Sequence, residues 1–82
     1  INRYKIKMIN WKTTKPTDRS GITFYNEREI ICTKALLVKY KSGDNIFFFF
    51  FLYIHSKKEW QDWETFRLEN VIGWYDLTDD LN

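Results

Sequence analysis

The sequence predicts a small all-β or β-rich α+β domain: an antiparallel sheet of about five strands, strongly curled or SH3-like, with at most one short helix. Apolar runs are short, and polar or glycine-containing segments separate them along the chain. Aromatic residues make up 20% of the 82 residues, which gives a short chain a large apolar area. Residues 46–54 form an uncharged run with five consecutive phenylalanines. We therefore expect residues 1–82 to form a single domain whose core includes this run.

The N-terminal part of the chain predicts short strands separated by polar segments. Residues 4–9 alternate apolar side chains with lysine, which indicates a half-buried strand. Residues 12–21 include the only proline and have the composition of a loop. Residues 22–25 form a short strand by their β-branched and aromatic content. Residues 26–29 interrupt this strand with charge, and residues 30–32 are apolar again.

A hairpin is expected at the centre of the chain. Residues 42–45, Ser-Gly-Asp-Asn, are turn-forming residues between two apolar runs. We expect them to join a strand over residues 35–40 to a strand over residues 46–54. Alternation places every aliphatic residue of the second strand on one face. Phe48 and Phe50 on this face are therefore expected to be the deepest phenylalanines.

The opposite face of the same strand is aromatic and forms the candidate interface. It consists of Phe47, Phe49, Phe51 and Tyr53. Monomeric soluble proteins rarely expose apolar patches larger than a few hundred Å². We therefore expect another chain to cover this face, most simply in a homodimer. The competing possibility is that the first strand or residues 60–68 fold over it.

The segment after the phenylalanine-rich strand allows two structures. Ser56 and Glu59 have the spacing of a capping box, which indicates one or two turns of helix with Trp60 and Trp63 on one side. The alternative, which we favour, is a polar loop that leads into a strand over residues 63–68.

The second half of the chain is acidic. Residues 71–75 are apolar and predict the last strand, and residues 78–82 predict a frayed acidic end. Residues 1–41 carry ten Lys/Arg and three Asp/Glu, whereas residues 42–82 carry three Lys/Arg and eight Asp/Glu. This asymmetry indicates either a basic face for nucleic acid or nucleotide phosphate, or opposite charges paired across neighbouring strands, which we favour.

Cysteine content and hydropathy predict a cytoplasmic location. Cys32 is the only cysteine, so no intramolecular disulfide can form, and a lone cysteine fits a reducing compartment. No basic-then-apolar signal sequence opens the chain, and the run at residues 46–54 is too short to span a bilayer as a helix. We therefore expect no membrane partner.

Catalysis and metal binding find little support in the residues present. His55 is the only histidine, and the apolar neighbour of Cys32 indicates a buried, inert thiol. One histidine and one cysteine cannot complete a zinc site. Asp76, Asp79 and Asp80 lack the twelve-residue loop of a calcium site. We expect neither an enzyme nor a bound cofactor or metal.

Binding has better support, because tryptophans lie close to cations in the second half of the chain. Aromatic faces next to cations can stack a base and hold a phosphate. Tryptophan and arginine are also enriched at protein–protein hot spots. Alternatively, the tryptophan rings only cover the phenylalanine-rich sheet. The candidate binding residues are Lys57, Lys58, Trp60, Trp63, Arg67 and Trp74.

Three segments resemble a family of small phage and prophage domains of unknown function. They are Trp11-Lys12-Thr13-Thr14-Lys15-Pro16, Ala35-Leu36-Leu37-Val38 with Gly43, and Asn70-Val71-Ile72-Gly73-Trp74-Tyr75-Asp76-Leu77. In that family, a Trp…Pro loop precedes a Val-Leu-Val strand and a Gly-centred hairpin, and Val-Thr-His-Trp leads into Met-Pro-Leu-Pro-Glu-Pro-Pro. Here Gly73 replaces the histidine, Tyr75-Asp76 replaces Met-Pro, and the proline-rich tail is missing. The resemblance implies a small β-rich fold and a phage origin, and it implies no active site.

Three functions follow as expectations. The first is a non-enzymatic phage-type accessory protein, such as an immunity protein, that binds and neutralises a bacterial host factor in the host cytoplasm. The second is a binder that sequesters a nucleotide or a signalling molecule at the tryptophans. The third, weaker because the net charge is only +2 and the second half is acidic, is a module that binds nucleic acid through the basic first half.

Overall fold

The computed structural model describes residues 9–64 and 66–81, and its strands form one open antiparallel sheet. In chain order the elements are β1 (Gly21–Tyr25), β2 (Arg28–Cys32), β3 (Leu36–Ser42), β4 (Asn45–Ile54), β5 (Glu59–Gln61), β6 (Arg67–Leu68), β7 (Val71–Tyr75) and the 3-10 turn η1 (Leu77–Leu81). The sheet runs β1-β2-β4-β3-β7, with β5 paired to β4 and β6 paired to β5. The all-β prediction is confirmed. Residues 4–8 of the expected first strand lie outside the described residues.

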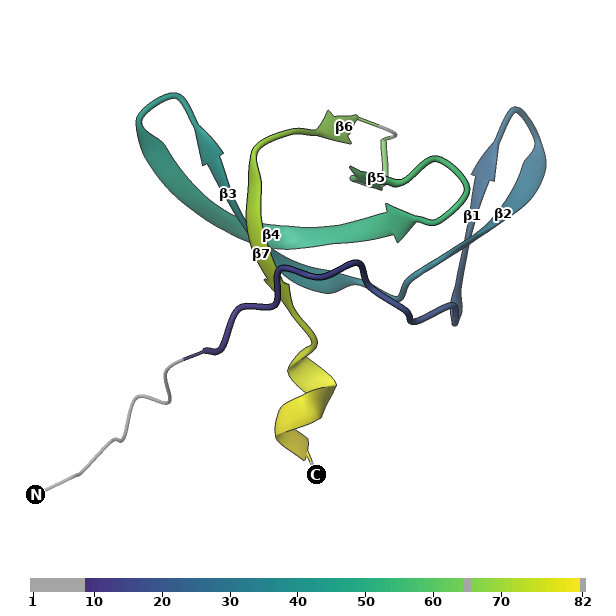
Figure 1. The fold of residues 1–82 in the computed structure, drawn as a ribbon. Helices are drawn as coiled ribbons and strands as arrows, with labels where there is room; N and C mark the ends of the chain where they lie inside the picture. Colours follow the sequence, from purple (N-terminus) through teal and green to yellow (C-terminus); the bar gives the residue numbers. More distant parts are fainter. Residues whose placement is uncertain (1–8, 65, 82) are drawn as a thin grey trace, which may run out of the picture.

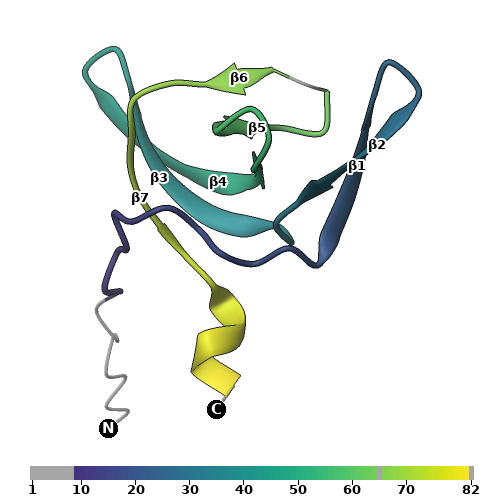
Figure 2. The ribbon, with the colours of Figure 1, turned by 45° about the vertical axis from the view of Figure 1, so that its right-hand side comes forward.

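The central hairpin forms as the sequence predicts. β3 and β4 pair antiparallel from Leu36 opposite Phe51 to Ser42 opposite Asn45, which leaves a two-residue turn. Gly43 in this turn has a φ of 60°, a conformation that glycine adopts without a steric penalty. In Figure 1 the end of this hairpin and the end of the β1–β2 hairpin rise on opposite sides of β5 and β6. η1 projects from the other side of the sheet, as Figure 2 also shows.

Burial in β4 depends on position along the strand as well as on face. Phe51 is 7% exposed, whereas Phe48 is 54% exposed and Phe50 is half-buried. The expectation that Phe48 and Phe50 are deepest is therefore wrong. The reason is that β5 pairs with residues 52–54 and returns Trp60 over this end of the strand, whereas residues 45–50 have only β3 as a neighbour. The buried cluster consists of Leu36, Val38, Phe51, Tyr53, Trp60 and Trp74.

The candidate interface is likewise divided into a buried half and an exposed half. The ring of Trp60 meets Tyr53 edge-on at 5.1 Å between centroids, and Tyr40 meets Phe51 at 5.4 Å. The chain itself therefore covers Phe51 and Tyr53, which corrects the expectation that another chain covers the whole face. The competing arrangement, in which the segment that starts at Trp60 folds over it, is present on this half. Phe47 and Phe49 on the other half stay exposed.

The segment after β4 is a turn that returns the chain to the sheet, not a helix. Residues 55–58 form the turn, and β5 then pairs with β4. The capping-box helix is therefore wrong, and the strand expected over residues 63–68 forms only at β6. The carboxylate of Asp62 accepts hydrogen bonds from the backbone N–H groups of Glu64 and Phe66, both at 2.9 Å. These bonds hold a turn where a strand was expected.

The described residues after β7 form a regular turn. The last strand is confirmed as β7, and the expected frayed end is instead the 3-10 turn η1. Asp76 accepts hydrogen bonds from the N–H and hydroxyl groups of Thr78, at 2.9 and 2.6 Å. Lys12 and Lys34 bind Asp79 and Asp76, so opposite charges from the two ends of the sequence are paired.

The uneven burial of β4 gives a stability prediction. Phe51→Ala removes a ring from the core and should lower the free energy of unfolding by about 3–5 kcal/mol. Phe48→Ala, a matched change on the exposed part of the same strand, should cost less than about 1 kcal/mol. Urea denaturation followed by far-UV circular dichroism measures both. A larger loss for Phe48→Ala than for Phe51→Ala would contradict the division of the strand.

Candidate functional site

The structure brings together only some of the candidate binding residues. Trp60 and Trp74, each 8% exposed, line the same cavity, whereas Trp63 is 60% exposed at the β5–β6 turn. The ammonium group of Lys57 lies 3.0 Å from the ring centre of Tyr25. None of the predicted cations Lys57, Lys58 and Arg67 lines this cavity. The tryptophans and the cations that the sequence groups together are therefore separated in space.

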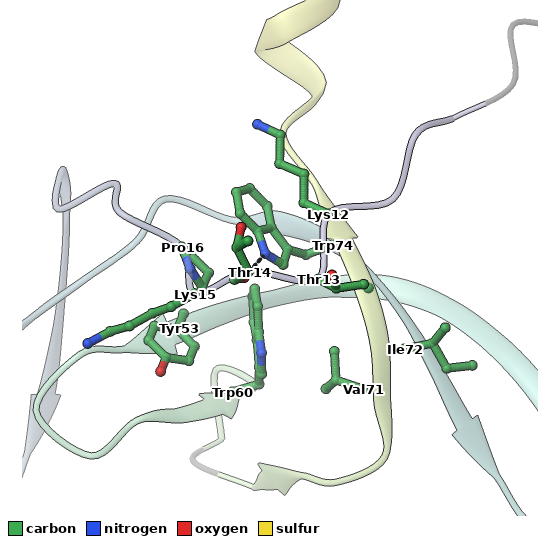
Figure 3. A pocket seen from close by; sticks show the side chains of 11 residues that line it. Lys12, Thr13, Thr14, Lys15, Pro16, Tyr53, Trp60, Val71, Ile72 and Trp74 are labelled. Carbon is green, nitrogen blue, oxygen red and sulfur yellow. Dashed lines mark hydrogen bonds between the residues drawn. The ribbon is translucent and has the colours of Figure 1, made fainter.

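The cavity lies between the N-terminal segment and the sheet, and its volume is about 240 Å³. We refer to residues 11–20, which cross the sheet before β1, as the strap. Figure 3 shows the rings of Trp60 and Tyr53 below the strap, with Val71 on the other side of Trp60, and the indole of Trp74 above the strap, on the side toward which Lys12 extends. The rings of Tyr53 and Trp60, from two different strands, therefore form an apolar floor under a polar segment, and Trp74 also lines the cavity.

Backbone contacts with β7 fix the strap above the cavity. Lys12 and Trp74 exchange two backbone hydrogen bonds, both 2.9 Å long. The indole N–H of Trp74 donates to the carbonyl oxygen of Thr14 at 2.6 Å, so its polar atom is satisfied although the ring is buried. A Cβ at Gly73 would lie 2.8 Å from Cβ of Trp11. The absence of a side chain at Gly73 therefore lets the strap pack directly against β7.

Two cations that sequence reasoning missed lie at this cavity. Lys12 places its ammonium group 4.9 Å from the ring centre of Trp74 and 3.2 Å from Asp79. Lys15 extends past Tyr53 in Figure 3, and among the described residues no acidic side chain pairs with it. The available signal was the run Lys-Thr-Thr-Lys before the proline, which places cations and hydroxyl groups in one short segment. Because this segment has the composition of a loop, its lysines were not identified as candidate site residues.

A second candidate surface lies at the end of the β3–β4 hairpin. We call residues 39–49 the distal hairpin. Its two faces each carry exposed apolar side chains, because residues opposite each other on the paired strands share a face. Phe47 and Phe49 lie on the face of Tyr40, while Ile46 and Phe48 lie on the other. Trp11 of the strap contacts Phe48 at 5.6 Å between ring centres.

Charged groups connect the end of the strap and the C-terminal turn to Lys34. Burial raises the pKa of Asp18, but hydrogen bonds from the Lys34 N–H and from Ser20 outweigh it and lower the pKa below its ordinary 3.8. Burial opposes ionisation of Asp76 in the same way, and the Lys34 ammonium group at 2.7 Å, with Thr78, lowers its pKa below 3.8. Lys34 therefore links strap and C-terminal turn.

The single cysteine and the single histidine of the chain are both buried. Cys32 is fully buried; burial and then the nearby charge of Asp18 raise the pKa of its thiol, which keeps it protonated. His55 Nε2 lies 2.6 Å from the carbonyl oxygen of Asp18, so this nitrogen donates, while Nδ1 is buried without a hydrogen-bond partner in the described part of the chain. Within the described ranges no group of His, Cys, Asp and Glu could hold a metal ion.

Comparisons with known proteins give no match: no family model, no curated protein and no solved structure is similar to this chain. Within residues 9–64 and 66–81, no helix has the length and apolar character that crossing a membrane requires. The candidate surfaces therefore have to be interpreted from their own geometry.

The anchors of the strap predict a loss of stability in acid. Asp18 and Asp76 have lowered pKa values in the folded state, so each stabilises the fold above pH 4. This contribution is lost as the pH falls below about 4 through the folded-state pKa values. The free energy of unfolding, measured by urea titration at a series of pH values, should decrease over this range. Asp18→Asn should flatten the decrease, and Asp44→Asn at the hairpin turn should not; an equal effect of both would contradict the assignment.

Proposed function

We propose that this chain is a non-enzymatic binding protein that holds another protein with the distal hairpin. The observation that carries the proposal is the exposure of Ile46, Phe47, Phe48 and Phe49, four consecutive apolar residues on both faces of a rigid β-hairpin. Aromatic side chains in such a position contribute large contact areas and lose little conformational entropy on binding. The hairpin is therefore well suited to insert into a partner.

The charges of the distal hairpin indicate the chemistry of the partner. Lys39 and Lys41 share a face with Phe48 and Ile46, and no acidic residue lies on that face of the two strands. An apolar cleft with an acidic rim would match both features. A second copy applied to the same face would bring lysines together, which opposes self-association there.

The biological setting remains the phage-type accessory protein described above. In this proposal the partner is a bacterial host factor in the host cytoplasm, and binding neutralises it. The support is the resemblance to small phage and prophage domains, together with the small size of the chain and the exposed aromatic residues of the distal hairpin. A partner bound in a one-to-one complex would be inhibited because the hairpin occupies its binding surface, and not because a reaction modifies it.

Site-specific photo-crosslinking tests this function. A benzophenone side chain at position 48 should crosslink one bacterial protein, and one at position 66, on an equally exposed phenylalanine, should not. The captured protein, once purified, should bind the chain in a one-to-one complex by calorimetry. Phe48→Asp should weaken this binding by about 2 kcal/mol, roughly 30-fold, because hot-spot residues contribute at least this much.

The matched variant separates binding from folding. Phe66→Asp introduces the same charge at an exposed aromatic residue outside the hairpin, and it should leave affinity unchanged. Both variants should keep the melting temperature of the parent chain. Equal loss of affinity in both, or undiminished affinity in Phe48→Asp, would contradict the role of the distal hairpin.

A second candidate function, a site for a nucleotide-type ligand, is favoured by the cavity below the strap. Trp60 and Tyr53 make its floor, Trp74 also lines it, and Lys12 and Lys15 come from the polar strap. Indole faces stack on a base, and lysine ammonium groups bind phosphate. With a volume of about 240 Å³, the cavity suits a single base and not a dinucleotide.

Fluorescence titration tests the second candidate. Adenosine and guanosine monophosphate, added separately, should quench tryptophan emission in a saturable way if the base stacks on the cavity floor. Lys15→Ala should weaken binding of the monophosphate and leave binding of the free nucleoside unchanged, since only the phosphate contact is lost. Lys58→Ala, a lysine outside the cavity, is the matched control. Absence of saturation, or equal effects of the two lysine variants, would remove the ligand site.

A further inference from the structure

β1 is an edge strand without the features that normally protect such an edge. It pairs with β2 alone and carries the sequence Gly-Ile-Thr-Phe-Tyr, which contains no charged residue and no proline. Ile22 is 57% exposed and Phe24 is 61% exposed. Natural proteins usually place lysine, proline or a bulge on an exposed edge to prevent pairing with another strand. An open, apolar edge indicates that β1 has a strand to pair with.

The turn of the β1–β2 hairpin shows which backbone groups of β1 are unpaired. Asn26 and Glu27 form a two-residue turn and have positive φ angles of 49° and 64°. Such a turn is closed by a hydrogen-bonded pair, here Tyr25 and Arg28. Because pairs alternate in an antiparallel ladder, Ile22 and Phe24 direct their N–H and C=O groups to the open edge.

We propose that a second copy of this chain pairs with the open edge of β1, antiparallel and with Thr23 opposite Thr23 of the second copy. In this register Ile22 lies opposite Phe24 of the second copy, and the reverse pair forms by symmetry. Both are hydrogen-bonded pairs of a β-branched and an aromatic residue, a favourable cross-strand combination. Tyr25 lies opposite Gly21 of the second copy, where an aromatic ring compensates for the missing side chain.

Charges on either side of β1 fit the same register. Arg19 and Glu27 lie at equal distances before and after Thr23 in the sequence, so in this register each lies at the same end of the paired strands as the oppositely charged residue of the second copy. Both side chains are exposed, and neither forms a salt bridge with the residues that the structure describes. A two-fold axis at Thr23 therefore pairs charges that are unpaired in the single chain. A slip of the register would lose this pairing.

The proposed pairing also covers apolar side chains. Ile22, Phe24 and Ile31 share one face of the hairpin and are all exposed. Across the two-fold axis they would join the same residues of the second copy in one continuous stripe. A self-complementary patch of this kind closes into a dimer and not into a fibre. The proposal is independent of the distal hairpin, which lies on the other side of β5 and β6 in Figures 1 and 2.

Cysteine crosslinking tests the register directly. In Thr23→Cys the two thiols face each other across the axis in a non-hydrogen-bonded pair, where Cα atoms are about 4.5 Å apart and a disulfide can form. Mild oxidation should give a covalent dimer. Ile22→Cys alone and Phe24→Cys alone should not crosslink, but a mixture of the two should. The parent chain, whose only cysteine is buried Cys32, is the control. Crosslinking of Ile22→Cys alone, or none of Thr23→Cys, overturns the register.

Sedimentation equilibrium tests the interface without a crosslink. The parent chain should be dimeric, and Thr23→Lys, which opposes like charges at the axis, should be monomeric with an unchanged circular dichroism spectrum. Arg19→Glu should weaken the dimer at least several-fold, and the double variant Arg19→Glu/Glu27→Arg should restore it. Phe48→Asp should remain dimeric. A monomeric parent chain overturns the proposal, as does a dimer that Phe48→Asp dissociates and Thr23→Lys does not.

Discussion

The packing of Trp60 against Tyr53 is the interaction on which the rest of this structure depends. It exists because the turn after β4 brings three residues of β5 back along the end of that strand. This short pairing gives residues 52–54, which lie beyond the end of β3, a partner strand and brings Trp60 into the core cluster that contains Phe51. The remainder of β4 lacks such a neighbour and continues outward as the distal hairpin. One contact therefore sets both the position of the core and the position of the exposed aromatic surface.

The strap completes this core from the other side of β7. It begins with Trp11 against Phe48 and Gly73, crosses the edge of β7 at Lys12, and reaches the indole of Trp74 at Thr14. Lys34 and Asp18 hold its far end. The surfaces to which we assign function are a cavity under the strap, an aromatic hairpin and an open strand edge.

These surfaces are separated by the architecture of the sheet. The two hairpins rise on opposite sides of β5 and β6, as Figure 2 shows, so occupation of one leaves the other accessible. A dimer at the β1 edge would display two distal hairpins, and a partner with two or more copies could then be bound bivalently. Effective concentration raises such binding well above that of one hairpin without any new contact. A small domain with an inert core can gain affinity in this way.

The sequence by itself determined the local structure. Turn residues between apolar runs located the β3–β4 hairpin and β7, because these signals act within a few residues. Alternation could not identify Phe51 as buried and Phe48 as exposed. The alternation of side chains along a strand predicts on which face a residue lies, but it does not predict which distant strand covers that face. The same limit applies to the strap: Lys12 and Lys15 reach Trp60 and Trp74 only through long-range pairing with β7. Tertiary contacts decided burial and the site, since both depend on neighbours far apart in the chain.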